Sequence, residues 1–185
     1  MDRKQEAGKE AYNRAFRRRL DDIAWRMQER KRILPVVEYI VGNSVLDLGC
    51  SYGALADMIQ DRKYTGVDFS EVAIEYAREH VQSPNAQFVL GSFYDDLPLE
   101  VCDTVVLLQV LEHTWGYKEL FDFACELANE RVIVTVPRNA PGGTHLKHLW
   151  SREDLEALGS MEIFKKLDNI RWLAVYDMRK DVPIS

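Results

Sequence analysis

The chain has 185 residues, a length that fits one folded domain whose core needs no disulfide or metal for stability. Its 46% hydrophobic and 29% charged content excludes a disordered, collagen-like or coiled-coil chain, and the net charge of -6 argues against a uniformly basic nucleic-acid-binding protein. The sequence has no apolar run approaching the ~18 residues of a transmembrane helix, no apolar signal segment at its start and no C-x-x-C pair among its cysteines. These features predict a cytoplasmic protein without a membrane partner.

The N-terminal segment differs from the rest of the chain in charge. The first 34 residues hold eleven Lys/Arg and six Asp/Glu, a net +5, whereas the remainder holds thirteen and twenty-four, a net -11. Such a basic arm leaves nucleic-acid binding open, although it is not the expected function. Apolar residues recur in the arm at helical spacing, with Asp21 and Asp22 suited to divide the helix: Tyr12, Phe16, Leu20, Ile23 and Met27. We expect residues 1–34 to form a helical arm or lid and residues 35–185 to form the core.

From residue 44 onward, continuous apolar runs alternate with amphipathic segments. The expected strands are 44–49, 64–69, 86–90, 102–108, 131–136, 161–167 and 170–178. The expected helices are 54–60, 71–80 with Ser70 as its cap, 117–130, and a last one whose capping box is Ser151 and Asp154. This alternation is typical of a parallel sheet covered by helices on both faces. Only two residues separate the last two strands, and such a short link joins antiparallel strands. The sequence therefore predicts a doubly wound α/β fold with seven mainly parallel strands and an antiparallel last strand.

A glycine-containing turn follows the first strand in VLDLGCSYGALA. Glycine lets the backbone turn tightly and approach a ligand, and we expect the helix 54–60 to begin there. Asp68 ends the second strand, where a carboxylate can accept both hydroxyl protons of a ribose. A dinucleotide-dependent dehydrogenase fits less well, because Ser51 replaces the middle glycine of G-x-G-x-x-G and Asp47 would repel a pyrophosphate.

Three segments in chain order resemble the class I S-adenosylmethionine-dependent methyltransferases. VLDLGCSYG is similar to their usual first motif, VLDLGCGxG, with Ser51 in place of glycine. GVDFSEVAIEYAR resembles their second motif, and CDTVVLLQVLEH resembles their fourth-strand segment ending in LEH. The resemblance runs from about Val45 to the C-terminus, and that family's sheet also ends in an antiparallel strand.

The resemblance implies a set of residues that bind S-adenosylmethionine. Those around the amino-acid portion of the cofactor are Asp47, Gly49, Cys50, Ser51 and Gly53. The second motif implies that Asp68 holds the ribose diol and that Phe69 lies beside the adenine. In LGSFYDDLP, Ser92 stands where the family often has an acid for the adenine amino group, which implies that this contact is either weaker or moves to the Phe93 backbone or to Asp95. Gln109 corresponds to a position near the transferred methyl group.

The expected reaction is methyl transfer to an unidentified acceptor, with a small molecule favoured and the methyl placed on oxygen or nitrogen. Glu112 and His113 are the candidate catalytic residues, because an alcohol or phenol acceptor must lose its proton. LEH also occurs in the superfamily whatever the substrate, so simple positioning of the acceptor is an open alternative. Metal-assisted O-methylation is another alternative, because some members with a similar arrangement bind a divalent metal through ExxEH and a later His. Here Gln109 replaces the first Glu, which leaves Glu112 and His113 with His145 or His148 as possible ligands. A third is a non-catalytic nucleotide-binding member acting through partners.

Overall fold

The computed structural model describes residues 10, 13–14, 16–138 and 150–181, and within them seven strands form one sheet. The strands are β1 (Ser44–Leu48), β2 (Lys63–Asp68), β3 (Ala86–Leu90), β4 (Cys102–Leu108), β5 (Ala128–Pro137), β6 (Met161–Lys166) and β7 (Arg171–Asp177), in the order β3-β2-β1-β4-β5-β7-β6. Strand β7 runs antiparallel to both of its neighbours, while β1 pairs with β4, β4 with β5 and β2 with β3 in parallel. The predicted α/β sheet with an antiparallel last strand is confirmed.

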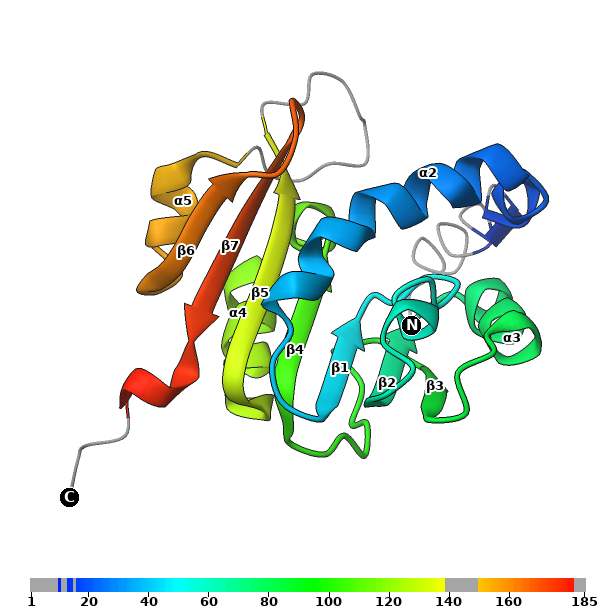
Figure 1. The fold of residues 1–185 in the computed structure, drawn as a ribbon, viewed down its shortest axis with the longest axis horizontal. Helices are drawn as coiled ribbons and strands as arrows, with labels where there is room; N and C mark the ends of the chain where they lie inside the picture. Colours follow the sequence, from blue (N-terminus) through cyan, green and yellow to red (C-terminus); the bar gives the residue numbers. More distant parts are fainter. Residues whose placement is uncertain (1–9, 11–12, 15, 139–149, 182–185) are drawn as a thin grey trace. The chain divides into compact units, whose positions relative to one another are not determined.

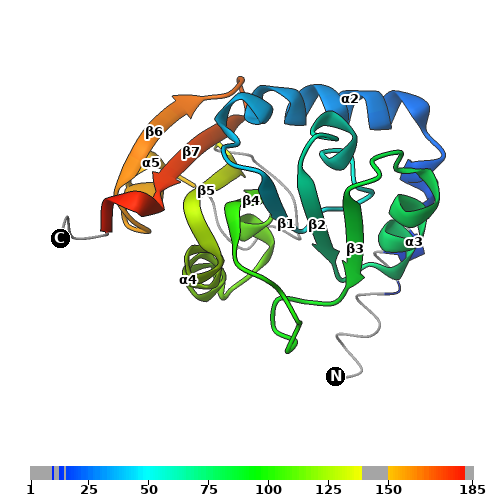
Figure 2. The same ribbon diagram turned by 60° about the horizontal axis from the view of Figure 1, so that its bottom comes forward.

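Helices connect most of these strands. The α-helices are α2 (Ile23–Ile33), α3 (Glu71–His80), α4 (Tyr117–Leu127) and α5 (Arg152–Glu156), and the short 3-10 helices are η1 (Leu34–Tyr39), η2 (Ala56–Met58), η3 (Leu111–His113) and η4 (Met178–Asp181). Helix α3 packs on β2 and β3, and α4 packs on β4 and β5 (Figures 1 and 2). The predicted caps are present, since Ser70 accepts from the Ala73 N–H and Ser151 and Asp154 form a capping box. In the described part of the chain, every helix is too short or too polar to cross a bilayer.

The described residues divide into two compact units. One combines the chain up to Val37 with Gly49–Leu97, and the other combines Glu38–Leu48 with the chain from Pro98 onward. The first unit therefore holds α2, α3, β2 and β3, and the second holds β1 and β4 to β7.

The prediction of a helix at 54–60 is wrong, because only the three-residue η2 forms there. The segment buries Ala54, Leu55, Ala56 and Ile59, all at most 4% exposed, so apolar side chains face several directions rather than one stripe. An isolated helix shorter than about 12 residues is marginal unless packing favours it. Here packing favours a compact turn, and an argument from a helix dipole at the first motif does not apply.

The prediction of one continuous apolar face along the N-terminal arm is wrong for the second half of the arm. Phe16 and Leu20 are buried against Tyr52 and other residues of the first unit, as expected. Ile23 and Met27, by contrast, are 64% and 56% exposed. The expected division of the arm at Asp21 and Asp22 is confirmed: the chain turns there, and the Asp22 side chain caps α2 by accepting from the Ala24 and Trp25 N–H groups. Because the helix restarts there, the 3.6-residue periodicity does not carry across it; Tyr12 lies outside the described residues.

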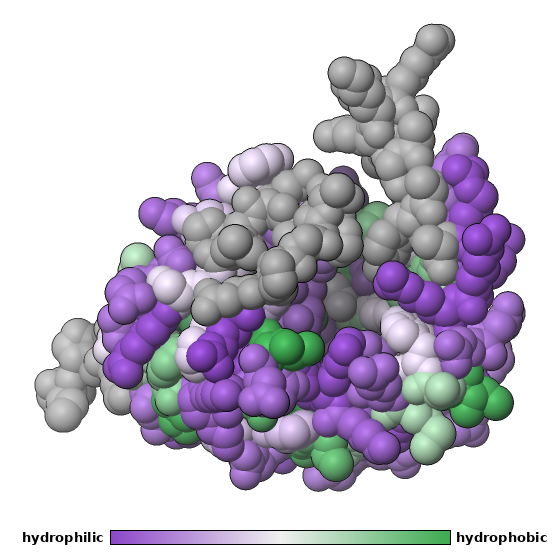
Figure 3. Space-filling view, turned by 90° about the horizontal axis from the view of Figure 1, so that it is seen from above, coloured by the Kyte–Doolittle hydropathy of each residue, from purple (hydrophilic) through white to green (hydrophobic). Residues whose placement is uncertain are grey.

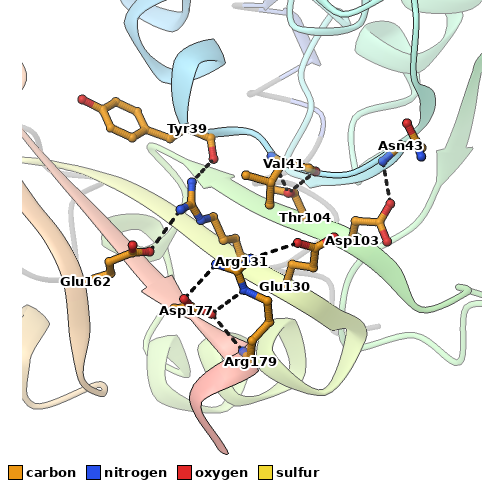
Figure 4. A network of polar contacts seen from close by, with 10 residues as sticks. All are labelled: Tyr39, Val41, Asn43, Asp103, Thr104, Glu130, Arg131, Glu162, Asp177 and Arg179. Carbon is orange, nitrogen blue, oxygen red and sulfur yellow. Dashed lines mark hydrogen bonds and ion pairs between the residues drawn. The ribbon is translucent and has the colours of Figure 1, made fainter. Parts of the chain in front are cut away.

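A polar network in the second unit fixes the entry to β1 (Figure 4). The Asp103 carboxylate accepts from the Asn43 and Ser44 N–H groups at 2.6 and 3.0 Å. Thr104 accepts from the Val41 N–H and donates to the Val41 carbonyl. Arg131 donates to the Tyr39 carbonyl at 3.0 Å and pairs with Glu162. These bonds set where β1 starts, and so where the turn after it falls.

Candidate functional site

The turn after β1 folds back on β2 through its backbone. The Gly49 and Cys50 N–H groups both donate to the Val67 carbonyl, at 2.8 and 3.0 Å. Gly49 and Gly53 have φ of +88° and +78°, and a Cβ on Gly53 would come within 2.8 Å of the Phe88 and Val81 side chains. Both positions therefore need glycine, for conformation at each and for space at the second.

Ser51 also has a positive φ, +54°, in the middle of this turn. A non-glycine residue in the left-handed region carries strain of about 1 kcal/mol or more. Strain of this kind concentrates at functional sites, and the family's first motif has glycine at this position. The structure thus gives a conformational reason for that glycine.

Replacing Ser51 with glycine is expected to raise the free energy of unfolding by about 0.5–1 kcal/mol, because glycine adopts this φ without strain. Chemical denaturation of the wild type and Ser51→Gly measures the difference. Ser160→Gly is the matched control: Ser160 is exposed and is not among the residues with positive φ, so glycine there should be neutral or destabilising. Equal shifts in both variants would contradict the strain assigned to Ser51.

The Asp68 carboxylate joins the turn to the start of α3. Its Oδ2 accepts from the Ser51 N–H at 2.9 Å, and its Oδ1 accepts from the Ser70 N–H at 2.8 Å. Asp68 is 6% exposed, and burial raises its pKa while N–H groups of Ser70, Ser51 and Phe69 oppose that rise. Each carboxylate oxygen has a further lone pair, so the group can still accept two hydroxyl protons.

Residues of the N-terminal arm contact both the turn and the cap of α3. The Ser70 hydroxyl donates to Asn13 Oδ1 at 2.6 Å. The Tyr52 ring packs on Trp25 with ring centroids 5.5 Å apart, and its hydroxyl donates to the Arg26 carbonyl at 3.0 Å. Sequence reasoning missed Asn13 and Tyr52, because only long-range packing brings them to the first and second motifs.

The segment after β3 begins next to Asp68. The Gly91 N–H donates to the Asp68 carbonyl at 3.0 Å. The Ser92 N–H donates to Asp95 Oδ2 at 2.7 Å, and the Phe93 ring lies against the exposed Tyr94 with centroids 4.1 Å apart. Phe69 itself is 41% exposed. The first unit thus groups Asp68 with the start of the loop that holds Ser92, Phe93 and Asp95.

In the second unit, Asp47 and Gln109 lie at the carboxyl ends of β1 and β4. Asp47 is 3% exposed and pairs in register with Val106. Gln109 follows β4 directly, donates its N–H to the Thr135 carbonyl at 2.9 Å and has a φ of +61°. Its Nε2 is buried without a hydrogen-bond partner within the described residues. A strained backbone and an unsatisfied amide at one position are typical of a binding site.

Glu112 and His113 form the 3-10 turn that follows. Glu112 is 2% exposed, its Oε2 has no hydrogen-bond partner among the described residues, and burial raises its pKa to about 8. The Nε2 of His113 lies 3.9 Å from Glu112 Oε1, and the His113 side chain is half exposed. At neutral pH the pair therefore presents an uncharged carboxyl group beside an accessible imidazole.

His145 and His148 lie outside the described residues. Within the ranges that are described, no three His, Cys, Asp or Glu side chains group in a way that could hold a metal ion. The side chains of Cys50 and Cys102 are both buried, and the Cys50 side chain lies so close to Gly66 that a Cβ on Gly66 would come within 2.8 Å of its sulfur. Cys50 thus acts in packing between the turn and β2.

The sheet order β3-β2-β1-β4-β5-β7-β6, with β7 antiparallel, is that of the α/β methyltransferase fold. A family model described as a methyltransferase domain matches residues 45–129. Over that segment, and in the order of its sheet, the chain is similar to methyltransferase domains.

Solved structures with the same fold cover nearly the whole chain at low sequence identity. The magnesium protoporphyrin IX methyltransferase of Synechocystis PCC 6803 with bound S-adenosylhomocysteine is 17% identical, with a TM-score of 0.74 over 94% of this chain and 99% of that one. A S-adenosylmethionine-dependent methyltransferase of Aquifex aeolicus is 14% identical, with a TM-score of 0.72 over 90% and 98% of the two chains. No curated protein matches the sequence. These likenesses concern the fold.

Proposed function

We propose that the protein transfers the methyl group of S-adenosylmethionine to the oxygen or nitrogen of a small-molecule acceptor. The observation that carries the proposal is the Asp68 carboxylate, which is buried, held by two backbone N–H groups and still able to accept two hydroxyl protons. That arrangement suits a ribose diol. The adjoining turn contains Gly49 and Gly53, which have no side chains, so its backbone can approach the amino-acid portion of the cofactor closely.

The residues that would hold the cofactor are those of the turn and of the segments after β2 and β3. Asp47, Gly49, Cys50, Ser51 and Gly53 are assigned to its amino-acid portion, Asp68 to the ribose, and Phe69, Ser92 and Phe93 to the adenine. S-adenosylmethionine supplies a methyl group on a positively charged sulfur, so the protein's main contribution is alignment. Gln109 is assigned to the region of that methyl group.

Glu112 and His113 are assigned to the acceptor. Gln109 Nε2 and Glu112 Oε2 have no hydrogen-bond partner among the residues that the structure describes, and this supports a polar acceptor, because buried polar atoms normally have such partners. An uncharged Glu112 carboxyl can both donate and accept one hydrogen bond, and the accessible His113 imidazole can take a proton from a hydroxyl. The alternative is a larger acceptor, either a carrier-bound molecule or a nucleic acid.

The test is transfer of a labelled methyl group from S-adenosylmethionine to pooled metabolites, RNA and protein. Turnover with a metabolite pool supports the proposal. Binding of S-adenosylhomocysteine without turnover on any pool would favour a non-catalytic protein that acts through partners. Preferential binding of NAD in calorimetry would refute the cofactor assignment.

Once an acceptor is found, His113→Ala is expected to lower turnover about 100-fold or more while the affinity for S-adenosylhomocysteine stays unchanged, if the imidazole takes the acceptor proton. A chelator should leave the wild-type rate unchanged. Loss of activity with chelator and recovery with a divalent ion would instead support the metal-assisted alternative. Full activity of His113→Ala in chelator would exclude both and leave positioning of an already nucleophilic acceptor. His80→Ala, on the exposed end of α3, is the matched control.

A further inference from the structure

One side of α2 and of its C-terminal cap, Leu34, carries three large apolar side chains that the described chain leaves uncovered. Ile23, Met27 and Leu34 are exposed by 64%, 56% and 61%. They are four and seven residues apart, a spacing that places them on the same side of a helix. Single exposed apolar residues are common on protein surfaces, but a row of three along one helix is not. Figure 3 shows hydrophobic side chains as separate green patches on a largely hydrophilic face.

Basic side chains accompany this apolar row. Arg30 and Lys31 lie on α2 next to it by the same helical spacing, and both are exposed. Arg17, Arg18 and Arg19 are exposed in the helical turns just before α2. Arg30 forms an ion pair with Asp57, whose Oδ2 lies 3.4 Å from the Arg30 Nη1. The Arg30 side chain is nevertheless 44% exposed. Acidic side chains on α2 are otherwise engaged: Asp22 caps the helix and Glu29 pairs with Arg32.

We propose that α2 and the arginines before it dock the protein on an anionic lipid surface. In this arrangement Ile23, Met27 and Leu34 enter the boundary between headgroups and acyl chains, and the basic side chains contact lipid phosphates. Amphipathic helices that lie in a membrane interface combine these two features, and clusters of four to eight Lys/Arg favour anionic lipids. The net +5 of the first 34 residues, against -11 in the rest of the chain, favours contact of this segment with a negative surface.

Two other occupants fit less well. A nucleic acid would engage the cations, but it gives no reason for the exposed apolar row: single strands stack their bases on aromatic side chains, and the exposed apolar residues of α2 are aliphatic. A second copy of the chain would bring the same basic side chains together, and like charges repel. The proposal departs from the expectation of no membrane partner, because the structure shows that Ile23 and Met27 lie outside the core.

The test is sedimentation of the full chain with vesicles of phosphatidylcholine, with or without phosphatidylglycerol. Binding is expected to the anionic vesicles at low salt, to weaken at high salt and to be absent with phosphatidylcholine alone. The double variant Ile23→Gln/Met27→Gln should bind about tenfold more weakly or worse, because partial burial of two apolar side chains is lost. Changing Arg17, Arg18 and Arg19 to Gln should weaken binding about fivefold for each arginine.

Matched controls separate the α2 face from general hydrophobicity and charge. Val101→Gln/Ile170→Gln removes two side chains that are 55% and 52% exposed in the second unit, and Lys118→Gln removes an exposed charge on α4. These variants should bind vesicles as the wild type does. All changed positions are exposed, so thermal melts should show intact folding.

Three results would overturn the proposal. The first is no binding to anionic vesicles at low salt. The second is tight binding to RNA that the Ile23→Gln/Met27→Gln variant retains in full, which would assign the basic side chains to nucleic acid. The third is a dimer in light scattering that the same double variant dissociates, which would assign the apolar row to a second copy of the chain.

Discussion

Asp68→Ala is expected to weaken binding of S-adenosylhomocysteine at least about 100-fold. A charged acceptor that binds two hydroxyl groups contributes about 1.5–3 kcal/mol for each hydrogen bond, and about 1.4 kcal/mol corresponds to tenfold in affinity. Isothermal titration calorimetry measures the change. Asp61→Ala is the matched control, because Asp61 is exposed near the start of the same strand.

The Asp68 carboxylate also has a structural role, since the Ser51 and Ser70 N–H groups donate to it. Losing it should lower the free energy of unfolding by about 1–3 kcal/mol, so binding must be measured well below the unfolding temperature. Asp68→Asn keeps an oxygen for one of these N–H groups. It is therefore expected to be more stable than Asp68→Ala but still to bind S-adenosylhomocysteine poorly. Wild-type affinity in a folded Asp68→Asn or Asp68→Ala variant would refute the ribose assignment.

Glu112→Gln is expected to stabilise the protein at pH 7 and above. Burial raises the pKa of Glu112 from an ordinary 4.5 to about 8, so the folded state keeps a proton that the unfolded state loses. Between these values the unfolded state binds fewer protons, and stability falls as pH rises; above the folded pKa the loss is complete and the slope ends. One pKa unit corresponds to about 1.4 kcal/mol, which sets an upper limit of about 3 kcal/mol at pH 7.

Glutamine has nearly the same shape but cannot ionise, so its variant should lack this part of the pH dependence. The difference in free energy of unfolding between Glu112→Gln and the wild type should grow from about pH 4.5 to pH 8 and then level off. Denaturant titrations across that range measure it. Glu119→Gln, an exposed position on α4, should show no such trend. A constant difference at all pH values would show that Glu112 is not held uncharged by the fold.

A stabilising Glu112→Gln would also bear on function. Buried groups that lower stability persist where activity requires them. If the carboxyl group contacts the acceptor, the same variant should lose turnover while it gains stability, a combination that a purely structural residue would not give.

Much of the sheet is predictable from the sequence, because its causes are local. Strands β3 and β4 match the expected ranges. The mainly apolar run of β4 indicates a buried strand, and β4 is buried along most of its length, whereas β3 is an edge strand in which only Phe88 is buried. The reversed direction of β7 follows from the two residues, Asp168 and Asn169, that separate the predicted strands around them. The cap at Ser70 follows in the same way from a hydroxyl residue before a helical pattern.

The candidate site is only partly predictable. Motif order indicates the turn after β1 and Asp68 at the end of β2, and the structure places them in hydrogen-bond contact through the Ser51 N–H. The positive φ of Ser51 and Gln109 and the contacts of Asn13 and Tyr52 are absent from any motif, because they depend on how distant segments pack.

By itself, then, the sequence determined the strand types, the α/β class and the motifs that indicate a cofactor, all of which depend on patterns within a few residues. Only the tertiary structure decided which apolar residues are covered. Leu20 and Ile23 belong to one predicted face, yet the first is buried and the second exposed, because the helix restarts at Asp22. The same holds for Glu112, whose raised pKa comes from burial by neighbouring elements and not from the residues beside it in the chain.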